Sequence, residues 1–471
     1  MQKTKDGQQS PNIHIAVENF GPIEKAEIDL RPLTVFVGES NTGKTYLAAL
    51  IYALQRAFEG FARIPWLYDT ILLLREIDAE TLKALEKLNT YEQSFKFSDL
   101  PQWSRTGTLH GLNNPKLFKD ELERCFNLGS VSELVLFTGS RRNELKVSLK
   151  VSEGDQPLWN FEMKGSESDI IVSGKVNEDM ILRVKGETVS EKKLDFENLA
   201  TLFNRSKVPD FYYLPAARSG VMETYGVIIS SLVEGATRGG LERFPEYATF
   251  SGIIADFLKQ IINYREGRVS SDEMGGIAAV LEDEVLRGEI RVRRNAAGSL
   301  EFRYRPQKSE QTLRMSQSSS MVSELAPLVL FLRGIVQPGD TLIIEEPEAH
   351  LHPAAQTKVA LTLARLVRAG VRVIITTHSE WLLEQIGNLV REGEVMKLGK
   401  NKTEPTTWLT KEEVGAWWFR EDEPVKEIEF EHIAGIEPEE YGEVAEELYN
   451  RSVDLRTQLE ETVGGTEVEQ E

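Results

Sequence analysis

The sequence predicts an α/β protein built on a parallel sheet, and three observations point to this fold class. A continuous apolar run at residues 33–37 is typical of a strand buried on both faces. A glycine-containing loop and a helical pattern over residues 44–58 follow it. In the last third of the chain, apolar strands at 341–346 and 371–377 alternate with helical segments. Such alternation indicates parallel pairing through helical crossovers.

Length and composition indicate a globular protein of more than one domain. With 471 residues, 41% hydrophobic and 28% charged, the chain can bury a large core and is long enough for two or three domains. No apolar run reaches the ~18 residues of a membrane-spanning helix, and the polar N-terminus lacks a secretory signal. The single cysteine, Cys125, excludes an intramolecular disulfide. We therefore expect a soluble, cytoplasmic protein that does not bind a membrane.

Negative charge is concentrated towards the C-terminus. The chain has 55 basic and 75 acidic residues, a net charge of −20. Residues 421–471 contain 18 acidic and three basic residues, so this segment carries −15 and the first 420 residues only −5. Because phosphates respond to local patches, the body of the protein can still bind nucleic acid. The acidic segment is either a solubilising tail or a docking surface for a basic partner. Just before it, Trp408 and the run Trp417–Phe419 belong either to an interface or to the core.

Changes in residue pattern divide the chain into parts. Residues 60–130 are mostly helical in pattern, whereas five segments between 132 and 190 alternate like strands of an antiparallel sheet. Residues 221–287 return to a helical pattern, and 289–306 predict a β-hairpin. The expected parts are a disordered N-terminus (1–10), an α/β core in two halves (11–60 and 309–420), a helical insertion (61–130), a β-rich lobe (131–220), a helical arm with a β-hairpin (221–308) and an acidic C-terminal segment (421–471).

The most specific motif lies between the first buried strand and its helix, and it fits G-x-x-x-x-G-K-[ST] in full. In such a loop the backbone N–H groups and the helix N-terminus attract phosphates, and Gly43 lets the backbone approach closely. Lys44 reaches the β- and γ-phosphates, and the Thr45 hydroxyl binds Mg²⁺. The sequence therefore predicts a site for ATP and Mg²⁺ formed by Gly38, Glu39, Ser40, Asn41, Thr42, Gly43, Lys44 and Thr45.

Two carboxylates end the strand at 341–346. In a P-loop NTPase, one carboxylate at this position organises Mg²⁺ and the next polarises the attacking water. Because adjacent strand residues point to opposite faces, the two carboxylates cannot share one role. We expect Glu345 to hold the metal together with Thr45, and Glu346 to act as the catalytic base.

Histidines follow both of the later strands. His378 comes directly after the last apolar strand, where it reaches the γ-phosphate if that strand lies beside the strand ending in Glu345. We therefore expect His378 to be catalytic. His350 and His352, together with Glu348, allow a zinc site, but their spacing brings no further ligands, and a loop-shaping role is favoured.

The combination of GESNTGKT, LIIEEPEAHLHP and ITTHS resembles the ABC-type ATPases of the RecF, SMC and OLD group. The opening VENFGPIEKAEIDLRPLTVFVGES resembles the start of the AAA15/OLD-like ATPases that are common in bacterial defence loci. The resemblance covers about residues 12–55 and 315–390. It implies a P-loop NTPase core of the ABC-ATPase type with an antiparallel β lobe and a helical insertion. The phosphate loop is then Walker A, and Glu345 and Glu346 form Walker B.

The resemblance also implies how subunits meet. The turn SQSSSMVSEL stands where these proteins place their signature motif, so Ser318, Ser319 and Ser320 would contact the γ-phosphate held by a partner subunit. ATP would be sandwiched between head-to-tail chains, in a homodimer or a higher homo-oligomer. In two departures from the family pattern, the turn lacks the usual glycine pair and Glu345 stands where Asp is more common. Slow turnover is therefore expected.

Three functions fit these observations. The resemblance implies the ATPase of a bacterial anti-phage system, PARIS-like or Septu-like, that senses a phage protein and controls a separate effector. The effector would be a TOPRIM nuclease or another toxin, because no nuclease motif is visible in this chain and it ends soon after His378. The alternative is a RecF-like DNA-binding repair ATPase, and a transporter subunit is least favoured. Either phosphate contacts or simple protection of a strand edge explains the hairpin residues Arg291, Arg293, Arg294, Arg303 and Arg305.

Overall fold

A six-stranded sheet forms the centre of the molecule. The computed structural model describes residues 12–62, 93–99, 102–135, 137–138, 141–142, 144–165, 169–184, 210–238, 250–266, 271–294, 300–398, 407–432, 435–436 and 446–459. The strand order is β11-β15-β16-β3-β17-β18; the first five are parallel and β18 is antiparallel to β17. The strands are β11 (Phe211–Leu214), β15 (Thr341–Glu345), β16 (Arg372–Thr377), β3 (Leu33–Gly38), β17 (Val414–Phe419) and β18 (Lys426–Ile428). The predicted α/β fold is confirmed.

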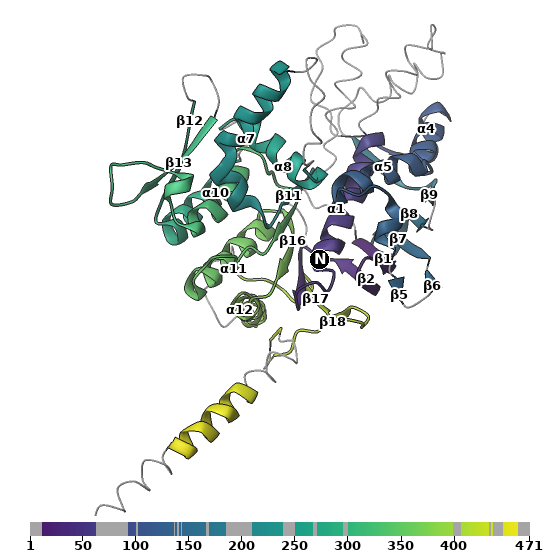
Figure 1. Ribbon diagram of the computed structural model, residues 1–471. Helices are drawn as coiled ribbons and strands as arrows, with labels where there is room; N and C mark the ends of the chain where they lie inside the picture. The colour runs from purple at the N-terminus through teal and green to yellow at the C-terminus, as the bar shows by residue number, and fades with distance from the viewer. Residues whose placement is uncertain are drawn as a thin grey trace, which may run out of the picture.

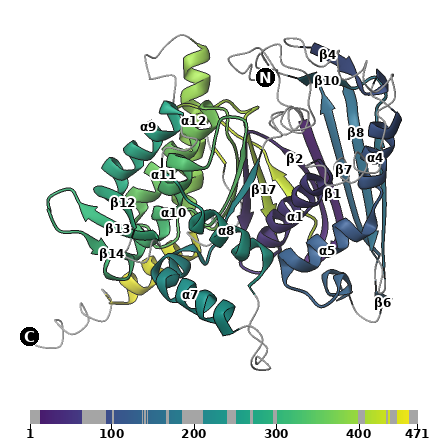
Figure 2. The same ribbon diagram turned by 90° about the horizontal axis from the view of Figure 1, so that it is seen from above.

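Each face of this sheet is covered by a separate core. Val35 and Val37 point into one core, while Phe36 between them points into the other, because successive strand side chains alternate between faces. Helices α7 to α12 cover the first face, and α1 (Lys44–Ala62) lies between the second face and an antiparallel sheet (Figure 2). All six residues of β3 are buried, which explains its continuous apolar run.

The helices of the first core pack on one side of the sheet (Figure 1). Among them, α10 is buried almost all round, because 12 of its 15 residues are buried. A helix buried in this way is apolar on every face. This matches the apolar helix that the sequence predicts after the serine-rich turn. The helices are α7 (Arg218–Arg238), α8 (Gly252–Ile262), α9 (Asp272–Leu281), α10 (Ser320–Gly334), α11 (Pro353–Arg368) and α12 (Glu380–Lys397).

The second sheet is antiparallel and has the order β2-β1-β7-β8-β9. Its N-terminal strands come from the range 11–60, which the sequence predicts to belong to the α/β core. They join this sheet because β1 pairs with β7 from Asn12 opposite Ser152 to Glu18 opposite Lys146. The strands are β1 (Asn12–Phe20), β2 (Ile23–Leu30), β7 (Leu145–Glu153), β8 (Gln156–Gly165) and β9 (Ile170–Val176).

Smaller elements complete the described chain. The predicted hairpin is confirmed as β12 and β13, with β14 added at its edge. Residues 446–459 form an exposed helix (Figure 1, yellow). The remaining elements are β4 (Gln93–Lys96), β10 (Ile181–Val184), β5 (Phe137–Thr138), β6 (Arg141–Arg142), β12 (Gly288–Arg294), β13 (Leu300–Pro306), β14 (Leu313–Arg314), α4 (Gln102–Leu112), α5 (Pro115–Phe126) and the short helical turns η1 (Phe97–Asp99), η2 (Val131–Leu134), η3 (Glu282–Leu286) and η4 (Met315–Gln317).

Several segments differ from the sequence-based expectation. Strand β4 lies in the range expected to be helical. It forms a strand because it pairs with β10, which comes from a distant part of the chain. Strand β11 lies within the range of the β-rich lobe but pairs with β15 of the parallel sheet. Trp417, Trp418 and Phe419 are buried in β17, so this run belongs to the core and not to an interface. The expected disorder of residues 1–10 concerns residues outside the described part.

Within the described residues, no helix combines the length and apolar character needed to cross a bilayer.

Two helical glycines provide a test of the packing. A Cβ on Gly393 in α12 would lie 1.9 Å from the carbonyl oxygen of Leu409, whereas one on Gly226 in α7 would meet no atom within 4 Å. Gly393→Ala should lower the free energy of unfolding by at least about 1 kcal/mol, and Gly226→Ala should raise it by about 0.5–1 kcal/mol. Urea denaturation of both variants measures the difference, and equal effects would contradict the packing of α12.

Candidate active site

The predicted phosphate loop joins β3 to α1 at the carboxyl edge of the parallel sheet. β3 ends at Gly38 and α1 begins at Lys44. Both glycines of the motif have positive φ, 141° for Gly38 and 105° for Gly43. A Cβ on Gly38 would lie 2.0 Å from the carbonyl oxygen of Phe419, and one on Gly43 would lie 2.5 Å from Cγ1 of Ile23. The backbone path therefore requires glycine at both ends of the loop.

Lys44 is buried at the start of α1, with 5% of its surface exposed. Its Nζ donates to the carbonyl oxygen of Gly38 at 2.9 Å and to that of Glu39. Burial lowers the pKa of Lys44 to about 8, although Glu346 and Glu348 act in the opposite direction. A buried ammonium beside a helix N-terminus attracts anions, and phosphate is the anion that a loop of this sequence holds.

The other loop residues differ in exposure. Glu39, Ser40 and Asn41 are exposed, while Thr42 is buried and its hydroxyl donates to the Glu39 carbonyl oxygen at 2.8 Å. Thr45 is exposed in the first turn of α1. Thr42 therefore holds the loop in shape, and the Thr45 hydroxyl is accessible to a ligand.

Glu345 ends β15 in an enclosed position. Its carboxylate is 7% exposed and accepts hydrogen bonds from the Tyr213 hydroxyl and, at 2.7 Å, from the Ala216 N–H. Burial raises the pKa of Glu345, and these two hydrogen bonds act in the opposite direction. Each carboxylate oxygen keeps a second lone pair, so a contact with a metal-bound water is compatible with both bonds.

Glu346 has a different environment because the backbone turns at this residue. Its φ of 41° is a left-handed value that costs a non-glycine residue about 1–2 kcal/mol. Its side chain is 43% exposed, and Oε1 lies 3.7 Å from Nε2 of His378. Burial and the charge of Lys44 lower the pKa of His378, while Glu346 acts in the opposite direction. Lys44, Glu346 and His378 therefore meet at the ends of three neighbouring strands.

Glu348 orders the segment that carries the histidine. Its Oε1 accepts from the Thr377 hydroxyl at 2.6 Å and from the His378 N–H at 2.9 Å. Burial raises the pKa of Glu348. From the sequence alone, Glu348 is a zinc-ligand candidate with His350 and His352 and not a partner of the His378 segment. Within the described chain no three His, Cys, Asp or Glu side chains form a group that could hold a metal, and His352 instead caps α11.

Sequence reasoning missed Arg218, which follows β11. Its side chain is 1% exposed and donates to the carbonyl oxygens of Glu345 and Glu346. One signal was present: Arg218 is the only charged residue between Phe211 and Met222. A charged side chain within an apolar segment must find partners if the segment is buried, but the sequence does not identify those partners.

The three predicted signature serines lie where α10 begins. The Ser318 hydroxyl donates to the Met315 carbonyl oxygen at 2.6 Å. Ser319 is the N-cap of α10 and Ser320 its first residue, and both are exposed. Helix α10 packs in the core on the face of the sheet opposite α1 (Figure 2). The serines and the phosphate loop are thus attached to different sides of the sheet.

The residues at this edge fit a nucleoside triphosphate with a divalent cation. The phosphates would meet the loop N–H groups and Lys44, whose Nζ contacts loop carbonyl oxygens in this structure. The oxygen ligands that Mg²⁺ prefers are available from Thr45 and Glu345. In addition, Oε2 of Glu348 is buried and has no hydrogen-bond partner among the described residues, so it can accept a hydrogen bond from a ligand or its water.

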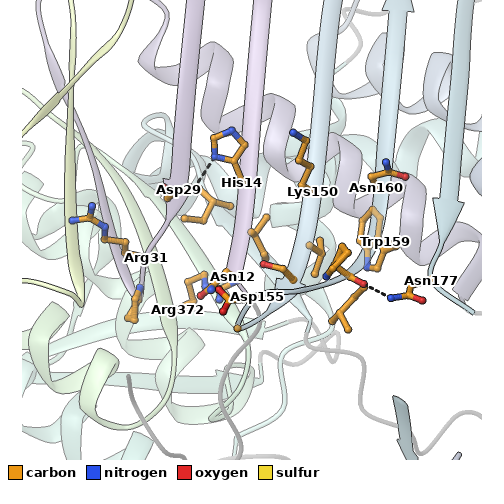
Figure 3. Close-up of a pocket in the computed structure, with 18 of the residues that line it drawn as sticks. Asn12, His14, Asp29, Arg31, Lys150, Asp155, Trp159, Asn160, Asn177 and Arg372 are labelled. Carbon is orange, nitrogen blue, oxygen red and sulfur yellow. Dashed lines mark hydrogen bonds and ion pairs between the residues drawn. The ribbon is translucent and has the colours of Figure 1, made fainter. Parts of the chain in front are cut away.

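A cleft with a volume of about 950 Å³ lies at the other end of the parallel sheet (Figure 3). Arg31, which precedes β3, and Arg372, which begins β16, line it together with Trp159 of the antiparallel sheet. Arg31 and Arg372 stand at the amino ends of β3 and β16, and the carboxyl ends of these two strands carry the phosphate loop and His378. The cleft is therefore separate from the candidate active site.

The burial of Lys44 predicts a pH dependence of stability. Its pKa is about 8 in the folded protein against 10.5 for an ordinary lysine, so the unfolded chain binds more protons between these values and stability rises with pH there. Without nucleotide, wild type should gain stability relative to Lys44→Met between about pH 7.5 and about pH 10. Urea denaturation at both pH values measures this, and a constant difference would contradict the burial of a charged Lys44.

Comparisons with known proteins give a family match and several similar solved structures. A family model described as AAA ATPase domain (AAA_15) matches residues 13–211 and 239–383. A search of curated proteins finds no match. One similar solved structure is an Smc head bound to the C-winged helix domain of ScpA; its identity is 8% and its TM-score 0.43, and the match covers 88% of this chain and 97% of that chain. A second is an Smc head domain with an extended coiled coil bound to the C-terminal domain of ScpA, derived from Pyrococcus furiosus; its identity is 11% and its TM-score 0.40, and the match covers 93% of this chain and 100% of that chain. A third is an SMC head domain from Thermotoga maritima; its identity is 10% and its TM-score 0.36, and the match covers 89% of this chain and 99% of that chain. The family match covers more than half of the chain, including the phosphate loop, the acidic strand end and His378. The chain therefore belongs to the AAA ATPase domain family, AAA_15.

Proposed function

We propose that the protein binds and hydrolyses ATP as an ABC-type ATPase. The observation that carries this proposal is the convergence of Lys44, Glu346 and His378 at one edge of the sheet. The ammonium is buried beside a helix N-terminus, and the carboxylate lies 3.7 Å from the imidazole. This arrangement supplies a phosphate site, a base and a group facing the terminal phosphate.

Each residue then has a distinct task. The loop N–H groups and Lys44 hold the phosphates, and Thr45 and Glu345 hold Mg²⁺, which when bound neutralises phosphate charge. Glu346 accepts a proton from the attacking water, because its carboxylate is exposed whereas that of Glu345 is enclosed. Burial and the charge of Lys44 lower the pKa of His378, which favours the neutral imidazole, and the single ring N–H of that form faces the γ-phosphate.

We further propose that two chains enclose ATP between the phosphate loop of one and the serine turn of the other. Ser319 and Ser320 are exposed at the N-terminus of a 15-residue helix, a position that favours negative charge. The Ser318 hydroxyl already donates to a backbone carbonyl, so the contact depends mainly on Ser319 and Ser320. ATP binding closes this homodimer or larger homo-oligomer, and hydrolysis opens it.

For the biological role we favour an anti-phage defence ATPase that forms a scaffold, senses a phage protein and controls a separate nuclease or other toxin. The resemblance of the motifs to the AAA15/OLD-like ATPases common in bacterial defence loci supports this proposal. The RecF-like alternative depends on the hairpin arginines. Arg291 and Arg305 pair with Glu289 at 3.1 and 2.9 Å, and Arg303 pairs with Glu301 at 2.8 Å. These pairs favour a solvated strand surface over a phosphate contact.

Two substitutions separate nucleotide binding from hydrolysis. Lys44→Ala should weaken ATP binding at least about tenfold, because it removes the buried ammonium. Glu346→Gln should bind ATP as wild type does but hydrolyse it about a hundredfold more slowly, because it removes the base. Calorimetry and phosphate release measure the two steps, with Lys146→Ala on the antiparallel sheet as control. ATP binding by Lys44→Ala at wild-type affinity would falsify the assignment of the loop.

Assembly should depend on ATP and on the serine turn. Glu346→Gln with ATP should elute as a dimer or larger species in light-scattering chromatography, because the closed form is not released. Adding Ser319→Arg and Ser320→Arg should keep the chain monomeric without loss of ATP binding, since the added bulk lies at the contact in trans. The control is Ser173→Arg, an exposed position on β9.

The same Glu346→Gln chain is suitable bait in its native host. Recovery of a stoichiometric nuclease-type protein supports the defence scaffold. Recovery of DNA with the dimer and without a protein partner contradicts it and favours the repair-like alternative.

A further inference from the structure

Arg218 makes an unusual set of contacts beneath the candidate active site. Its guanidinium donates to four backbone carbonyl oxygens: through Nε to Glu324 at 3.2 Å, through Nη1 to Pro215 at 3.1 Å and to Glu345, and through Nη2 to Glu346 at 2.9 Å. Nη2 also lies 2.5 Å from Oε1 of Glu324, and both side chains are 1% exposed. A planar guanidinium with five N–H groups can span such a set, whereas an ammonium cannot.

These contacts fix the backbone where Walker B turns. Glu346 has a φ of 41°, and its N–H donates to the Thr376 carbonyl oxygen at 2.9 Å. Arg218 binds the carbonyl oxygens on either side of that N–H. The polar groups that flank the turn are thus all held by other elements. Held in this way, the turn directs the Glu346 carboxylate towards His378.

The same guanidinium connects this turn to α10. Glu324 lies four residues after Ser320, on the helix that the serine turn begins. Burial raises the pKa of Glu324, and Arg218 acts in the opposite direction. Because α10 is buried almost all round, a shift of its first turn is transmitted to Glu324 as part of one rigid helix.

We infer that Arg218 is the positioning residue of this ATPase: it holds Glu346 in its catalytic orientation and joins that orientation to the serine turn through Glu324. The inference rests on the proposed ATPase function. A purely stabilising role explains the contacts less well, because a fully buried ion pair adds little net stability over apolar residues of similar volume. The bonds to both Walker B carbonyl oxygens instead define a geometry.

The test uses two variants of the full chain. Arg218→Lys keeps the charge opposite Glu324 but cannot reach all four carbonyl oxygens. The double variant Arg218→Met with Glu324→Met removes both charges, so that neither remains buried alone. Both should lower kcat for ATP hydrolysis by about tenfold to about a hundredfold, while KM and ATP affinity change less than about threefold. Lys44 and the loop, which hold the phosphates, are untouched.

The matched controls are Arg368→Lys and the double variant Arg368→Met with Glu413→Met. This Arg–Glu pair has a hydrogen bond of 3.0 Å and a buried glutamate, but lies towards the amino ends of the strands. Its loss should lower the melting temperature without separating kcat from KM.

The outcomes distinguish the inference from the function on which it rests. Absence of ATP binding and hydrolysis in wild type overturns both. Hydrolysis by wild type together with an unchanged kcat in folded Arg218→Lys overturns the positioning role alone. If the double variant does not fold, Arg218→Lys still decides, and the selective loss of kcat in that variant supports the inference.

Discussion

The parallel pairing of three strands is the constraint on which the candidate site depends. β16 pairs with β3 on one side and with β15 on the other. Because all three run in the same direction, their carboxyl ends meet at one edge of the sheet. This pairing brings Lys44 beside Glu346 and His378, although more than 300 residues separate Lys44 from Glu346 in the sequence. A different strand order would leave the same motifs apart.

The same edge concentrates buried charge. Five buried charged side chains lie around it, and the pKa of each is shifted in the direction that favours the neutral form: the pKa values of Lys44 and Arg218 are lowered, and those of Glu324, Glu345 and Glu348 are raised. Such burial costs free energy even when hydrogen bonds compensate for part of it. A fold stabilised only by packing has no reason to collect these groups, whereas a site for phosphate and a divalent cation does.

Two adjacent glutamates illustrate how backbone geometry assigns chemistry. Glu345 continues β15 and is enclosed by Tyr213 and the Ala216 N–H, whereas Glu346 leaves the strand at positive φ and faces His378. Their side chains are identical, so their different exposure comes from the turn between them and from the groups that enclose Glu345. Strand β11 and the loop after it enclose the Glu345 carboxylate, and Arg218 in the first turn of α7 anchors the backbone of Glu346, so this segment forms part of the site.

The sequence by itself determined the local features of this protein. The phosphate loop, the buried strands and the acidic pair follow from spacing within a few residues, and turn geometry, helix dipoles and strand alternation act over that range. Only the tertiary structure decided the roles of β4, Arg218 and Glu348. Their partners are distant in the chain, and no periodicity in one segment records which segment it packs against. The burial of a side chain and the partners that satisfy it are properties of the folded chain, because they depend on pairs of segments brought together by the sheet.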